Sequence, residues 1–199
     1  MKELNIKYQQ IKAIYEGLGH RFFDNGNWNV NLFGIRTCYD VVDEFNDYLG
    51  IAYRDERGIE RCIIHPGTTK PGLYWLAQNL GNPQGTFILA PGQYPQCWKI
   101  GQHKGYEALA QVGSPFLGWR DDDQDSMLDP NGKMYKDVTG LNMHTTSFIN
   151  HKEKVGAYSA GCQVRQRATH HTEVMAILRM SAKMYGNSFT YTLIHSLLH

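Results

Sequence analysis

GLNMHTTSFINHKEKVGAYSAGCQV, residues 140–164, is the most informative part of this chain. A short apolar segment, residues 141–143, precedes His144, and three small residues, 159–161, precede Cys162. Apolar residues before a histidine indicate a strand that ends near its side chain, while small residues indicate a turn with an unusual backbone conformation. We therefore predict a strand, a loop and a tight turn that present one imidazole and one thiol.

Cys162 and His144 are a candidate nucleophile and general base. A free thiol has a pKa of about 8.5, so little thiolate exists near neutral pH. A nearby imidazole can take the thiol proton and return it to a leaving group, while backbone N–H groups near Gly161 and Cys162 stabilise an oxyanion. The competing interpretation is a buried, inert thiol, because the chain has 4 cysteines and 9 histidines and one of each does not make a site.

The four cysteines are Cys38, Cys62, Cys97 and Cys162. An even count allows two disulfides. A chain of 199 residues does not need such crosslinks, and neither a CxxC pair nor a short Cys/His ligand spacing occurs. We predict three ordinary buried thiols and one that carries chemistry.

Composition predicts a folded chain, since 42% of the residues are hydrophobic and 12% are aromatic. The formal net charge of +1 argues against an extended nucleic-acid surface. No apolar stretch approaches membrane-spanning length, and the charged N-terminus lacks an apolar signal core. We therefore expect no nucleic-acid or membrane partner and a chain made and first kept in the cytoplasm.

Helices are predicted near both ends of the chain, with strands between them. Leu4, Tyr8, Ile11, Tyr15 and Leu18 alternate spacings of four and three, which is typical of one face of an amphipathic helix. A second helix is predicted over residues 171–185, ended by Gly186. Between turn signals we predict strands over residues 30–35, 49–53, 61–65, 73–76, 86–89, 97–100, 108–112, 116–120 and 189–194.

The sequence contains two candidate metal sites, an acidic stretch and a pair of histidines. Residues 121–125 carry four aspartates, but this acidic stretch lacks the glycine and terminal glutamate of an EF-hand, so a solvated loop is favoured over a calcium loop. His170 and His171 are adjacent and do not share a helix face, and no His-Glu-x-x-His motif occurs. We predict no metal and no cofactor, with a zinc site built from distant histidines as the alternative.

The 140–164 segment resembles the L,D-transpeptidase (YkuD-like) catalytic domain. That family's motif is a histidine, a gap, Ser or Thr, and then His-Gly-Cys; here His144 is followed by residues 145–158 and then by Ser159-Ala160-Gly161-Cys162. The resemblance implies Cys162 as the acyl-accepting nucleophile, His144 as its base, and Ser159 and Gly161 as residues that shape the turn. Ala160 departs from the pattern, because the family has a second histidine at that position.

Substrate contacts are expected around this pair. Arg120 ends an apolar run, and His103 and Tyr106 belong to the Gly-bounded segment that begins at Gly101, so each could line a cleft. A guanidinium can bind a peptide carboxylate through two hydrogen bonds. The complete set of expected substrate-binding residues is His103, Arg120, Thr145, Tyr158, Gln163 and Arg165.

The resemblance also implies a fold. We expect a mostly β (α+β) protein, a YkuD-like β-sandwich or open barrel with an N-terminal helix and a helix after the nucleophile turn. Residues 1–199 are expected to form a single catalytic domain, with a core over 66–199 and a family-specific elaboration over 1–65. The motif resemblance is specific over residues 85–194, and several segments there are similar to a phage and prophage branch.

The implied activity is that of a cysteine enzyme acting on peptidoglycan stem peptides. The thiol attacks a peptide carbonyl, and the thioacyl group passes to water or to an amine, which makes the protein a peptidase or a transpeptidase. The missing signal core favours a phage endolysin or a virion-associated lysin, made in the bacterial cytoplasm and acting on the cell wall after release or as part of a virion. The alternative is a non-enzymatic phage structural or wall-binding module on the same fold. The oligomeric state is not predicted.

Overall fold

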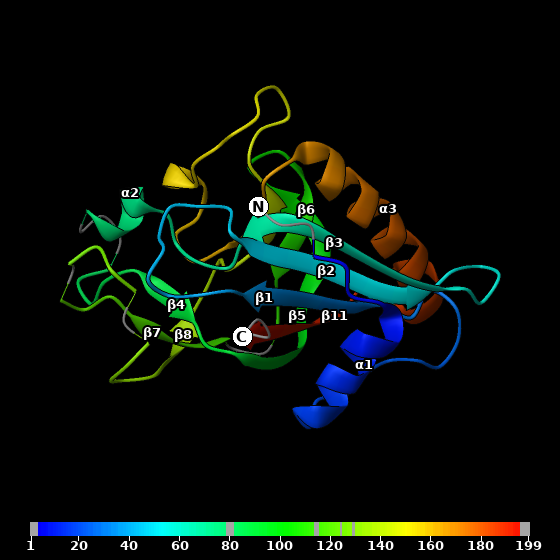
Figure 1. The fold of residues 1–199 in the computed structure, drawn as a ribbon. Helices are drawn as coiled ribbons and strands as arrows, with labels where there is room; N and C mark the ends of the chain where they lie inside the picture. Colours follow the sequence, from blue (N-terminus) through cyan, green and yellow to red (C-terminus); the bar gives the residue numbers. More distant parts are fainter. Residues whose placement is uncertain (1–3, 79–81, 114–115, 124, 129, 196–199) are drawn as a thin grey trace.

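The computed structural model describes residues 4–78, 82–113, 116–123, 125–128 and 130–195. Within these residues, eight strands close into a barrel and three further strands form a small separate sheet (Figure 1). The barrel order is β1-β11-β5-β6-β9-β10-β3-β2, and the small sheet has the order β4-β7-β8. The prediction of a mostly β fold with few helices is confirmed.

The elements have the following bounds. The barrel strands are β1 (Asn31–Arg36), β2 (Asp47–Arg54), β3 (Glu60–Thr68), β5 (Gly92–His103), β6 (Tyr106–Gln111), β9 (Met143–Thr145), β10 (Gln163–Arg165) and β11 (Phe189–His195). The small sheet contains β4 (Phe87–Leu89), β7 (Phe116–Arg120) and β8 (Tyr135–Val138). The helices are α1 (Tyr8–Gly17), α2 (Leu73–Leu76) and α3 (Ala168–Tyr185), and a 3₁₀ turn spans Gly156–Tyr158.

The barrel is closed, whereas a sandwich or an open barrel was expected. Closure comes from β1, which pairs antiparallel with β2 on one side and parallel with β11 on the other. Because β1, β2 and β3 supply barrel strands, the expected division between residues 1–65 and 66–199 falls inside β3.

Alternating side chains divide the barrel into an inner and an outer face. On β1, Leu32 belongs to the inner core, while Phe33 and Ile35 pack outside against Ile11 and Tyr15 of α1. This contact explains the apolar face of the first helix, which ends at Gly17. The sequence prediction of that helix is confirmed within the described residues.

Two large side chains organise the interior. Trp98 is fully buried, and its indole N–H donates to the carbonyl of Leu141 at 2.7 Å. Tyr191 of β11 donates its hydroxyl to Gln163 Oε1 of β10 at 2.7 Å, so this bond crosses the barrel between strands that are not neighbours. Gly34 makes room for it, because a Cβ there would lie 2.0 Å from the Tyr191 hydroxyl oxygen.

Most predicted strands are confirmed, and one is wrong. Residues 73–76 form the single helical turn α2 instead of a strand, with Gly72 as its N-cap. A short apolar run cannot distinguish the two by periodicity. β5 spans Gly92–His103 and so extends the strand predicted over residues 97–100 at both ends, and β8 lies over Tyr135–Val138, where no strand was predicted.

Candidate active site

The predicted nucleophile and base lie on neighbouring strands. β9 and β10 pair in parallel, with Val164 opposite His144 and Gln163 opposite Met143. The Gln163 N–H also donates to the carbonyl of Asn142 at 2.9 Å, which extends the pairing to the residue beside Cys162. Met143 and Gln163 face inward, so the side chains of His144 and Cys162 share the outer face of this strand pair. Cys162 directly precedes β10 and lies diagonal to His144, because Val164 is the residue opposite His144.

The imidazole of His144 has hydrogen-bond partners at only one of its two nitrogens, Nδ1, among the described residues. Its Nδ1 lies 2.8 Å from the carbonyl oxygen of Thr145 and 3.2 Å from the hydroxyl of Tyr106. Its Nε2 is buried and has no hydrogen-bond partner among the described residues. Since a carbonyl only accepts, we assign the proton to Nδ1, which leaves the lone pair of Nε2 available as a base.

Burial keeps this imidazole uncharged. Burial, together with a smaller contribution from the nearby imidazole of His103, lowers the pKa of His144 to about 3. The two rings stack with centroids 4.0 Å apart and planes inclined by 12°. Two imidazoles in face-to-face contact do not both take up protons readily, because the like charges repel. His144 is therefore a neutral base at neutral pH.

Cys162 rests as a protonated thiol. Its sulfur accepts from the backbone N–H of Asn142 at 3.5 Å and donates to the carbonyl of Gly140 at 3.5 Å. Between the described side chains of Cys162 and His144 there is no hydrogen bond. Burial raises the pKa of the Cys162 thiol, so the pair at rest is a neutral thiol and a neutral imidazole. Proton transfer requires the thiol to rotate away from Gly140.

The turn before Cys162 is closed by Ser159. Its hydroxyl donates to the carbonyl of Cys162 at 2.8 Å and accepts from the N–H of Gly161 at 3.2 Å. Gly161 has φ +115, and a Cβ there would lie 2.8 Å from the carbonyl oxygen of Phe87 in the small sheet. This position therefore requires glycine for both its backbone conformation and its space.

Replacing Gly161 by alanine is expected to lower the free energy of unfolding by about 1–3 kcal/mol, because the new Cβ meets both backbone strain and the carbonyl of Phe87. Chemical denaturation measures this cost. Gly132→Ala is the matched control, since Gly132 also has positive φ (+84) but open space around its Cβ position. Equal losses in the two variants would contradict a role for the Phe87 contact.

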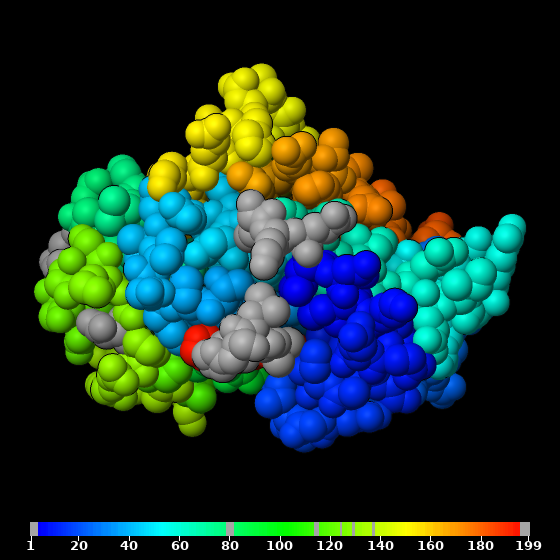
Figure 2. Space-filling model, viewed as in Figure 1, coloured from blue at the N-terminus to red at the C-terminus, as the bar shows by residue number. Residues whose placement is uncertain are grey.

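Tyr106, expected with His103 as a residue that could line the cleft, contacts the candidate base. Its hydroxyl donates to the carbonyl of Thr145 at 2.9 Å, the same oxygen that holds His144, and its ring meets Phe148 edge-on at 5.1 Å. Phe148 lies on the loop between β9 and β10, the yellow segment that projects from the barrel in Figures 1 and 2. The sequence signal for the position of Tyr106 is the pair Lys104-Gly105 before it. These two residues form a hairpin turn that pairs Tyr106 with His103.

Tyr106→Phe is expected to lower kcat for the reaction proposed below by about five- to tenfold, the value of one hydrogen bond that positions His144. KM is expected to change little, because the phenyl ring remains in place. Tyr74→Phe is the control, since Tyr74 is an exposed tyrosine on α2. A rise in KM with unchanged kcat would assign Tyr106 to substrate binding instead.

Three predicted substrate contacts are corrected by the structure. Thr145, Gln163 and Arg165 are fully buried, and each forms side-chain hydrogen bonds inside the protein. Thr145 Oγ1 donates to the carbonyl of Arg165, and Arg165 donates to the carbonyl of Leu49 at 2.8 Å. These side chains alternate with the outward-facing His144 and Cys162, so they point into the barrel.

The other expected contacts have different positions. His103 is half-buried, stacks on His144, and its Nδ1 lies 3.1 Å from the side-chain amide of Asn142. Tyr158 is half-buried and packs in the same small cluster as Cys162. Arg120 donates to the carbonyl of Gly85 at 2.9 Å and lies over the ring of Tyr135 in the small sheet. Their contacts with a substrate stay predictions.

The histidines considered for zinc form no common site among the described residues. His65 and His170 stack with ring centroids 3.8 Å apart, and His65 Nε2 lies 2.8 Å from Glu173. His171 is buried, with Nε2 2.8 Å from the carbonyl of Glu107. Nitrogen atoms of stacked rings do not converge on one point.

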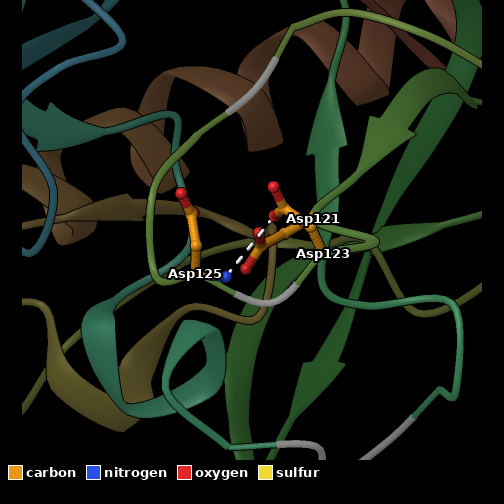
Figure 3. Close-up of side chains that lie close together, drawn as sticks. All are labelled: Asp121, Asp123 and Asp125. Carbon is orange, nitrogen blue, oxygen red and sulfur yellow. Dashed lines mark hydrogen bonds between the residues drawn. The ribbon is translucent and has the colours of Figure 1, made fainter.

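Three carboxylates of the acidic loop do converge. Ligand oxygens of Asp121, Asp123 and Asp125 lie within 4.8 Å of one another (Figure 3). Asp121 is buried, while Asp123 and Asp125 are exposed, so the prediction of a solvated loop holds for only part of it. Gln124 and Asp129 of this loop lie outside the described residues. Exposed acidic groups commonly approach one another without an ion, and the cluster alone assigns none.

All four cysteines are free thiols. Burial raises the pKa of Cys62 and of Cys97 to about 12 in both cases, which suits inert packing roles. In the part of the chain that the structure describes, no helix has the length and apolar character needed to cross a membrane. Comparisons with protein-family models, curated proteins and solved structures gave no match.

Proposed function

We propose that this protein is a cysteine-dependent enzyme that acts on the stem peptides of bacterial peptidoglycan through a thioacyl intermediate. The observation that carries the proposal is the pairing of β9 with β10. It puts Cys162 and His144 on the same outer face at diagonal positions. Nδ1 of His144 is fixed by Thr145, and its buried Nε2 has no partner among the described residues. The motif resemblance to L,D-transpeptidases adds support for the cell-wall substrate.

The proposed reaction begins when the Cys162 thiol turns from Gly140 toward Nε2 of His144. Nε2 takes the thiol proton as the sulfur attacks a peptide carbonyl carbon. The carbon–nitrogen bond then breaks, and the imidazolium returns its proton to the leaving amine. Water or a second amine attacks the thioester, which gives hydrolysis or transpeptidation and restores the thiol.

Two features of the site fit this cycle. The Gly161 N–H is engaged by Ser159 at rest, so the Cys162 N–H is the nearer donor for the oxyanion. His103 supplies a second imidazole against His144 from another strand, while Ala160, at the position of the family's second histidine, is exposed. We infer that His103 takes over part of that ordering role.

The proposed setting is a phage-type lysin, an endolysin or a component of the virion that reaches the wall after synthesis in the bacterial cytoplasm. The test is direct: purified sacculi are incubated with the wild-type protein and with Cys162→Ala, and soluble muropeptides are identified by mass spectrometry. New peptide ends or crosslinks are expected with the wild type alone. Identical product patterns, or no product from either protein, would overturn the proposal.

A second candidate is a non-enzymatic structural or wall-binding module. It is favoured by the resting state of Cys162, whose thiol is held by Gly140 and whose pKa is raised by burial. Alkylation by iodoacetamide at pH 7, mapped by mass spectrometry, separates the two candidates. An enzyme is expected to show Cys162 alkylation that depends on His144, whereas a module is expected to show a thiol as inert as Cys97.

A further inference from the structure

The hairpin turn between β5 and β6 carries a lysine in an unusual backbone conformation. β5 ends at His103 and β6 begins at Tyr106, and these two residues pair across the turn. Lys104 has φ +47 and Gly105 has φ +87, the left-handed values of a two-residue hairpin turn. Asparagine or glycine is the usual first residue of such a turn, so Lys104 adopts a backbone conformation that lysine rarely takes.

Both residues that flank this turn touch the candidate base. His103 stacks on the ring of His144, and the Tyr106 hydroxyl lies 3.2 Å from His144 Nδ1. The turn is therefore held in place above His144 by two independent contacts. Lys104 starts between these anchors, and its side chain is exposed.

The charge around the nucleophile is one-sided. The ammonium group of Lys104 lowers the pKa of Cys162, of His144 and of His103, which places it within electrostatic reach of all three. No carboxylate among the described residues contributes to the pKa of Cys162 or of His103. Lys104 also takes part in none of the ion pairs formed by the described residues.

We propose that Lys104 is a specificity residue that binds a carboxylate of the acyl donor next to the attacked carbonyl, so that the enzyme prefers acidic peptides. The inference rests on the proposed function. An ammonium at the rim of a site with no opposing carboxylate attracts anionic substrates and fixes their register. The carboxylate has two possible sources, the C-terminus of the peptide or an acidic side chain.

Three synthetic stem-like peptides separate these sources. One has a free C-terminal acid, one has a C-terminal amide with a glutamate beside the attacked bond, and one is neutral. For the wild type we expect kcat/KM to be about five- to tenfold higher for one acidic peptide than for the neutral one, the value of one partly exposed charge pair. Lys104→Asn is expected to reduce that ratio to about twofold or less, and Lys104→Arg to retain most of it.

The variants and outcomes are chosen to keep the result clear. Asparagine tolerates the left-handed conformation, so Lys104→Asn keeps the turn. Lys99→Asn removes an exposed lysine from β5, the strand that leads into the turn, and is expected to keep the wild-type ratio. A wild type that turns over no peptide would refute the proposed function itself. Turnover of all three peptides with the same ratio in wild type and Lys104→Asn would refute only the role of Lys104.

Discussion

Replacing His144 by asparagine is expected to lower the rate of muropeptide release by about a thousandfold or more. General acid–base catalysis contributes on the order of 10²–10⁴-fold, and the described strands β9 and β10 carry no imidazole besides that of His144. The asparagine amide can still donate to the carbonyl of Thr145, so the variant removes the Nε2 base while it retains the bond that Nδ1 makes.

The pH profile adds a second readout to this prediction. Catalysis needs a neutral His144, which exists above its pKa. Because burial lowers that pKa to about 3, the acid limb of the wild-type profile is expected below pH 5 and not near 6.5. His151→Asn is the control, since His151 is exposed on the projecting loop. More than a tenth of the wild-type rate in His144→Asn would exclude His144 as the base.

Trp98→Ala is expected to cost about 3–5 kcal/mol of unfolding free energy, a large part of the stability of a domain this size. Trp98 is fully buried, and its ring centroid lies 4.6 Å from that of Tyr191 and 5.8 Å from that of Phe116. The substitution leaves a cavity in the barrel and an unpaired carbonyl at Leu141. Urea titration followed by circular dichroism measures the loss.

Trp98→Phe separates the two contributions. The phenyl ring fills much of the cavity but does not donate to Leu141, so about 1–2 kcal/mol of the loss is expected to remain. Leu141 precedes Asn142, whose N–H contacts the Cys162 sulfur, and kcat is expected to fall as well. A cost below 1 kcal/mol for Trp98→Ala would show that the interior around Trp98 collapses without strain.

The fold was predictable where a pattern had one meaning. The spacing of Ile11 and Tyr15 fixed a helix, and the alternating final segment predicted β11. Residues 73–76 were misassigned because four apolar residues fit a strand and one helical turn equally well. Closure of the barrel was not predictable, because the parallel pairing of β1 with β11 joins residues about 160 positions apart, and no local signal records it.

The site was predictable in part. The motif predicts that Cys162 and His144 meet, and the structure puts both on the outer face of one strand pair. The substrate residues chosen from sequence proximity failed for Thr145, Gln163 and Arg165. The two-residue period of a strand predicts their burial, because the sequence neighbours of an outward-facing residue face inward. Lys104 was not found by proximity, because a hairpin about 40 residues earlier brings it to the site, and Tyr106 was expected there only as a residue of the cleft and not as a partner of His144.

The hydrogen bond from Tyr191 to Gln163 has a consequence for biosynthesis. Gln163, the residue after Cys162, accepts this hydrogen bond from β11, the last barrel strand to be synthesised. β1 also pairs with β11, so the barrel closes only after β11 is in place. A nascent chain that already contains Cys162 therefore lacks the Tyr191–Gln163 hydrogen bond next to that residue until translation has passed residue 195.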